Sequence, residues 1–161
     1  PGHWEGDLII GANNRSAVGT LVERTTRLVI LAKVDGTTAT AAAVGFSDKL
    51  NEVPRSLRLS MTYDQGREMV RHAEITQKTG TAIYFADPHS PWQRGSNENT
   101  NGLLRQYLPK GTDLSIYSQE ELDAIADSMN TRPRKTLDWR TPLEVYADVL
   151  KKSVAGPQTL Q

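Results

Sequence analysis

The chain has 161 residues, which is enough for one domain with a hydrophobic core and too few for two comfortable ones. Its 19 Lys and Arg residues balance its 19 Asp and Glu residues, so the whole chain lacks the basic charge of a small nucleic-acid-binding module. The absence of Cys excludes disulfides and thiolate chemistry, and no apolar run reaches the ~18 residues of a membrane helix, so we expect one soluble domain.

The first third of the chain predicts three strands, because apolar and polar residues alternate there and β-branched residues are frequent. These strands cover residues 4–10, 17–25 and 28–34. The connecting segments are short and rich in turn formers, which indicates an antiparallel meander.

The middle of the chain predicts alternating helices and strands. An Ala-rich stretch, residues 39–54, favours a helix that Pro54 ends. A strand over 57–63, a helix within 67–80 and a strand over 81–86 follow. The pattern indicates an α/β fold whose later strands are parallel and joined by helical crossovers.

The rest of the chain predicts three helices. The first starts at Ser96 and gathers its apolar residues on one side, namely Leu103, Leu104, Tyr107 and Leu108. The next two, over 118–130 and 141–152, each begin with the spacing of a capping box. Residues 153–161 lack periodicity, so we expect a flexible tail after a core of residues 1–152.

Three carboxylates sit where chemistry gathers in open α/β sheets, at strand ends and helix starts. Asp7 lies inside the first strand, Asp64 closes the fourth strand, and Glu98 opens the helix after the fifth. A charge inside a strand is costly unless it is paired or bound to a cation. If the first and fourth strands pair, Asp7 and Asp64 become neighbours, and Glu98 can reach over both.

Simpler explanations exist for each carboxylate. The segment after Asp64 is typical of a strand-to-helix turn, and Glu98 could merely complement a helix dipole. Glu5 is a rival ligand on the first strand and Asp87 on the fifth, although Asp-Pro mainly indicates a turn. Taken together, three oxygen ligands without Cys or paired His suit Mg²⁺ or Mn²⁺ better than Zn²⁺.

Four ordered stretches carry a family resemblance that covers residues 1–149. They are GHWEGDLIIG, TYDQGREM, HSPWQRGSNENTNGLLRQYLPKGTDL and NTRPRKTLDWRTPLEVY. They resemble the integrase-type catalytic core of bacterial insertion-sequence transposases, specifically the IS-thirty-type branch of the DDE superfamily.

This resemblance implies a ribonuclease-H-like fold with a five-stranded mixed sheet in the order 3-2-1-4-5. It maps the family's catalytic and metal-binding DDE triad onto Asp7, Asp64 and Glu98, with two Mg²⁺ ions per site for which Mn²⁺ substitutes. It implies hydrolysis at transposon ends followed by strand transfer from the freed 3′-hydroxyl. The partners implied are transposon-end and target DNA, a dimer or higher oligomer in the active complex, and a location in the bacterial cytoplasm.

The family's amino-terminal helix-turn-helix region has no counterpart in this sequence, which begins Pro-Gly-His, so we expect a domain of a longer polypeptide. Family members also carry a basic residue seven positions beyond the glutamate, which is Arg105 here. DNA contacts are further expected at polar and basic side chains, namely Trp92, Arg94, Asn101, Arg132, Arg134 and Lys135.

For several of these residues a structural role is the alternative. Trp92 could anchor its loop, Arg105 could pair with Glu98, and residues 132–135 could form a solvated loop between packing helices. A glycosidase with two carboxylates is a second enzyme class, but the sequence offers few aromatic platforms. A non-catalytic reading also remains, in which the core mainly assembles a protein–DNA complex.

Overall fold

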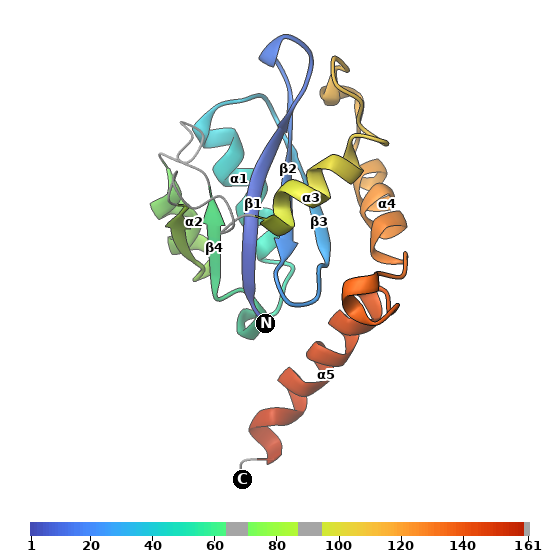
Figure 1. The fold of residues 1–161 in the computed structure, drawn as a ribbon. Helices are drawn as coiled ribbons and strands as arrows, with labels where there is room; N and C mark the ends of the chain where they lie inside the picture. Colours follow the sequence, from blue (N-terminus) through green and yellow to red (C-terminus); the bar gives the residue numbers. More distant parts are fainter. Residues whose placement is uncertain (64–70, 87–94, 160–161) are drawn as a thin grey trace.

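A computed structural model describes residues 1–63, 71–86 and 95–159, and for residues 95–98 and 154–159 only the course of the backbone. Its centre is a five-stranded sheet in the order β3-β2-β1-β4-β5 (Figure 1). The strands are β1 (His3–Ile10), β2 (Ala17–Glu23), β3 (Val29–Val34), β4 (Ser60–Tyr63) and β5 (Ala82–Phe85). β1, β2 and β3 pair antiparallel, whereas β4 lies parallel to both β1 and β5. The expected fold class and strand order are confirmed.

In the described ranges, five α-helices accompany the sheet. They are α1 (Ala39–Leu50), α2 (His72–Thr79), α3 (Gly95–Leu104), α4 (Gln119–Asn130) and α5 (Pro142–Thr159). Both expected capping boxes form, at Ser118 with Glu121 and at Thr141 with Glu144. The helix α5 continues through Thr159, past the position where the sequence predicted an irregular tail.

β2 and β4 are each shorter than the sequence predicted by two or three residues, and hydrogen bonds from side chains occupy the backbone groups near the ends concerned. The carboxylate of Glu23 accepts the N–H groups of Thr25 and Thr26 at 2.7 and 2.9 Å, so a turn begins directly after β2. The carbonyl of Leu57 accepts the indole N–H of Trp4 at 2.7 Å. Leu57 therefore belongs to a 3₁₀ turn, and β4 begins only at Ser60.

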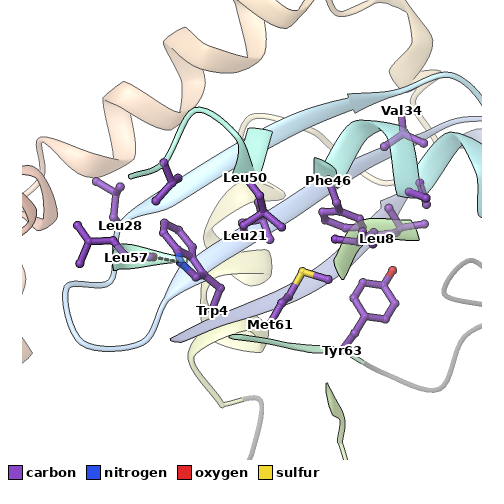
Figure 2. Close-up of a cluster of buried hydrophobic side chains, with 14 of the residues drawn as sticks. Trp4, Leu8, Leu21, Leu28, Val34, Phe46, Leu50, Leu57, Met61 and Tyr63 are labelled. Carbon is purple, nitrogen blue, oxygen red and sulfur yellow. Dashed lines mark hydrogen bonds between the residues drawn. The ribbon is translucent and has the colours of Figure 1, made fainter. Parts of the chain in front are cut away.

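The two faces of the sheet bury separate apolar cores, because successive side chains of a strand point to opposite faces. On one face Trp4 and Leu8 pack with Phe46 and Leu50 of α1 (Figure 2). On the other face Ile9 packs with the side chains of α3, α4 and their connecting segment. The predicted apolar group packs on this face, with Leu104 and Leu108 fully buried and Leu103 and Tyr107 partly buried against them, although α3 itself ends at Leu104 and Tyr107 and Leu108 lie in the turn after it.

Helix α4 also covers the open edge of β3. The side-chain amide of Asn130 accepts the Val29 N–H at 2.8 Å and donates to the Val29 carbonyl at 2.9 Å, as a neighbouring strand would. Gln119 does the same for the Leu31 carbonyl and the Lys33 N–H, both at 2.9 Å. The edge groups of β3 are thus satisfied within the chain, which protects against pairing with another strand.

Candidate active site

Asp7 lies in the middle of the central strand β1, on the face that α3 covers. Its side chain shares this face with Glu5 and Ile9, while Trp4 and Leu8 point to the opposite core. The carboxylate is half-buried, and its Oδ1 accepts the N–H of Leu8 at 2.8 Å.

A glycine beside Asp7 brings β1 close to its neighbours in the opposite core. A Cβ on Gly6 would lie 2.8 Å from the sulfur of Met61 and 3.1 Å from the ring of Tyr63, both on β4. A larger residue would therefore force the Met61 and Tyr63 side chains to shift. Gly6 thus leaves room for these two side chains in the core on the other side of the sheet from Asp7.

Helix α3 brings a second polar side chain to Asp7. The Nδ2 atom of Asn101 donates to Asp7 Oδ2 at 2.9 Å. The helix crosses β1 and β2 (Figure 1), and Leu104 at its end and Leu108 in the segment after it are buried against the sheet. The guanidinium of Arg105 donates to the carbonyls of Ile10 and Leu108, at 3.3 Å each, and so ties the end of α3 to the end of β1.

The three expected catalytic carboxylates are described to different extents. Asp7 is described completely, and Glu98 lies in α3 one turn before Asn101, with only its backbone described. Asp64 lies outside the described residues, directly after the end of β4. Within the described ranges no group of three His, Cys, Asp or Glu side chains could hold a metal ion.

The two rival carboxylates, Glu5 and Asp87, are also described to different extents. Glu5 is almost completely buried on the same face of β1 as Asp7, at 1% exposure, and its neighbour across the parallel pair is Thr62. A metal ligand must reach an ion that DNA can also approach, so this burial favours Asp7 over Glu5 as the ligand from β1. Asp87 lies outside the described residues.

The basic residues expected to contact DNA have mixed surroundings. Arg132 is exposed, lies over the Tyr107 ring at 5.6 Å from its centroid, and donates to its hydroxyl. Arg134 is half-buried, donates to the Met129 carbonyl at 3.2 Å, and has its pKa lowered by burial and by the charge of Arg132. Lys135 is exposed. Trp92 and Arg94 lie outside the described residues.

The sequence reasoning missed an exposed aromatic residue beside these cations. Trp139 is 68% exposed and has a positive φ of 66° in the loop that returns from Arg134 to Arg140. The N–H of Trp139 donates to the Arg134 carbonyl at 2.8 Å, which holds the loop closed. Its position within the basic stretch TRPRKTLDWR was the available signal.

A groove of about 430 Å³ lies along the edge strand β3, and β2 separates β3 from β1. Lys49 on its wall bonds to Asp123 at 3.1 Å and to Glu52 at 3.2 Å. Burial opposes the charged form of Lys49, but these two carboxylates outweigh it and raise its pKa. Lys49 is therefore paired with two of the carboxylates of this groove, and its bond to Asp123 links α1 to α4.

Comparisons with known proteins agree on the type of domain. A family model described as integrase core domain matches residues 1–91. The chain is 68% identical to the transposase for insertion sequence element IS1086 of Cupriavidus metallidurans, over 93% of this chain and 44% of that protein. It is 51% identical to the transposase InsI for insertion sequence element IS30A of Escherichia coli, over 89% of this chain and 37% of that protein. The chain therefore spans less than half the length of these relatives.

Among solved structures, the catalytic core domain of BIV integrase has the same fold. The TM-score is 0.69, and the match covers 95% of this chain and 98% of that domain at 17% sequence identity. In the described part of the chain, no helix is long and apolar enough to span a membrane.

Proposed function

Because the chain belongs to the integrase core domain family, we propose that it is the catalytic core of a DNA transposase. Its reaction is hydrolysis of a phosphodiester at a transposon end, followed by attack of the freed 3′-hydroxyl on a target phosphodiester. The observation that carries the proposal is the meeting of Asp7, on the central strand, with the helix that carries Glu98. In this fold, that is where strand and helix carboxylates can hold a cation together.

The strand register supports Asp64 as the second carboxylate. β1 and β4 are parallel, and Glu5 lies opposite Thr62. Asp7 follows Glu5 by two residues, and Asp64 follows Thr62 by two residues in the sequence. If the same register continues, the two carboxylates lie side by side on the face that α3 covers.

The donor set of Asp7, Asp64 and Glu98 fits Mg²⁺, with Mn²⁺ as a substitute, because all three offer hard oxygen ligands. A carboxylate oxygen has more than one lone pair, so the bonds that Asp7 accepts from Leu8 and Asn101 are compatible with metal binding. When bound, a pair of such ions would activate the attacking oxygen and stabilise the leaving one. The carboxylates then serve as ligands and need not act as nucleophile or general base.

DNA binding outside the metal site is proposed for the basic side chains. Lys135 and Arg132 are exposed and can meet phosphates directly. Arg105 uses two of its donors on backbone carbonyls, but a guanidinium has five, so a phosphate contact remains compatible with its position. Arg134 is the weakest of the group because its guanidinium faces the Met129 carbonyl. For Trp92 and Arg94 the proposal rests on the sequence alone.

The proposed partners are transposon-end DNA and target DNA. Joining two ends requires two active sites that act together, so we propose a dimer or higher oligomer in the active complex. The alternative function is a core that assembles the protein–DNA complex without catalysing the chemistry.

A strand-joining assay tests the proposal and separates these alternatives. The substrate is a pre-cleaved end of the encoding element, supplied with Mg²⁺ or Mn²⁺, and a full-length transposase of the family is the positive control. Joining should be lost in Asp64→Asn and retained in Asp87→Asn, the matched change in the rival carboxylate. Joining that survives Asp64→Asn would rule out the triad. A wild-type chain that assembles on end DNA without joining it would favour the assembly role.

A further inference from the structure

The hydrogen bond between Asn101 and Asp7 links the two elements that carry the proposed ligands. Asn101 lies three residues after Glu98, a spacing that puts the two positions on the same side of α3. Its Nδ2 atom is 2.9 Å from Asp7 Oδ2, while Asp7 Oδ1 accepts the Leu8 N–H at 2.8 Å. The carboxylate of Asp7 thus has a described donor on each oxygen, one from its own strand and one from α3.

The donor from α3 is neutral, which matters beside a cation site. Lys or Arg in this place would also bond to Asp7, but its positive charge would repel a divalent ion a few ångströms away. An amide orients the carboxylate and leaves its negative charge to the metal. Donors of this kind fix the geometry of metal-binding carboxylates in many proteins.

The oxygen of the Asn101 side-chain amide, Oδ1, is buried and makes no hydrogen bond among the described residues. A buried acceptor without a partner carries a free-energy cost, so such an atom calls for an explanation. Because Oδ1 and Nδ2 share one carbon atom, Oδ1 lies close to the Asp7 carboxylate. A water molecule bound to the metal ion is a donor that this acceptor could meet.

We propose that Asn101 is a positioning residue of the metal site: its Nδ2 holds the Asp7 carboxylate against α3, and its Oδ1 accepts a hydrogen bond from metal-bound water. The proposal rests on the proposed function, since it requires Asp7 to be a ligand. It replaces the sequence-based expectation that Asn101 contacts DNA. It also explains how the placement of Glu98 is coupled to that of Asp7, since one residue on α3 connects them.

Metal binding without DNA tests this role independently of catalysis. The chain is titrated with Mn²⁺, and the signal of the free ion is followed by electron paramagnetic resonance. Asn101→Ala should weaken Mn²⁺ binding by about 10-fold or more, as loss of a partner of a metal ligand commonly does. Asn99→Ala is the matched control, because Asn99 is exposed on the same helix and should bind Mn²⁺ like wild type.

A second measurement needs no variant and covers the case in which Asn101→Ala fails to fold. In a ¹⁵N-labelled chain, Mg²⁺ should shift the side-chain amide signals of Asn101 and leave those of Asn99 unchanged. Wild-type affinity in Asn101→Ala, or an Asn101 amide that does not respond to Mg²⁺, would overturn the positioning role while Asp7→Asn still abolishes binding. If Asp7→Asn also binds Mn²⁺ like wild type, the metal site itself, and with it the proposed function, is wrong.

Discussion

Replacing Asn130 with Leu should destabilise the fold, because its amide takes the place of a missing strand. Val29 is 1% exposed, and both its N–H and its carbonyl bond to the Asn130 side chain, which is 6% exposed. Leucine has a similar size but no hydrogen-bonding group. The substitution therefore leaves two buried backbone groups unsatisfied. It creates no cavity, because the two side chains are similar in size.

Each unsatisfied group costs about 1–3 kcal/mol, so for two groups we expect the free energy of unfolding to fall by about 2–6 kcal/mol. For a chain of this length, that corresponds to a melting temperature lower by roughly 4–24 °C. Urea unfolding followed by circular dichroism measures the free energy, and thermal unfolding followed by the same signal measures the melting temperature. Ser128→Ala is the control, since Ser128 is exposed on the same helix and its removal should change stability by less than about 0.5 kcal/mol. If Asn130→Leu were as stable as Ser128→Ala, the amide would not be the partner of the β3 edge.

Three further outcomes are expected. Gly102→Ala should raise the free energy of unfolding in urea by about 0.5–1 kcal/mol, because Gly102 is exposed within α3 and a Cβ there would meet nothing; a loss of stability would contradict this. Trp4→Phe should lower the free energy of unfolding by about 1–3 kcal/mol, because it removes the hydrogen bond to Leu57 and part of the buried side-chain volume. An unchanged urea midpoint would show that neither contributes to stability. Lys135→Ala should reduce the slope of log DNA affinity against log salt concentration by about 1, as measured by fluorescence anisotropy. Arg134→Ala should mainly lower the melting temperature, because the Arg134 guanidinium bonds to the Met129 carbonyl. The reverse pattern would contradict the placement of these two residues.

Local patterns in the sequence were sufficient for most of the fold. The alternation in residues 4–10 and 17–25 predicts β1 and β2, and the spacing of Ser118 and Glu121 predicts the start of α4. The side of α3 that packs on the sheet also follows from its helical period, as the burial of Leu104 confirms. These features depend on neighbours within a few turns of one element.

Contacts between distant residues were the part that the sequence could not supply. The bond from Trp4 to Leu57 shortens β4, and its two residues are 53 positions apart. Asn130 and Val29 are separated by 101 positions, and Asn101 and Asp7 by 94. An amide has no periodic signature, and its partner depends on how the elements pack. The role expected for Asn101 was therefore a DNA contact, although its position one turn after Glu98 already placed it near the site.

The central claim is that Asp7 binds a divalent ion during catalysis, and a change of metal preference tests it most directly. Asp7→Cys would introduce the chain's single thiol. A thiolate is a softer ligand than a carboxylate and is less suited to Mg²⁺ than to a transition metal such as Mn²⁺. Strand joining by Asp7→Cys should be lost in Mg²⁺ and partly restored in Mn²⁺, while wild type joins in both. Equal loss in the two metals, or unchanged joining in Mg²⁺, would contradict metal binding by Asp7.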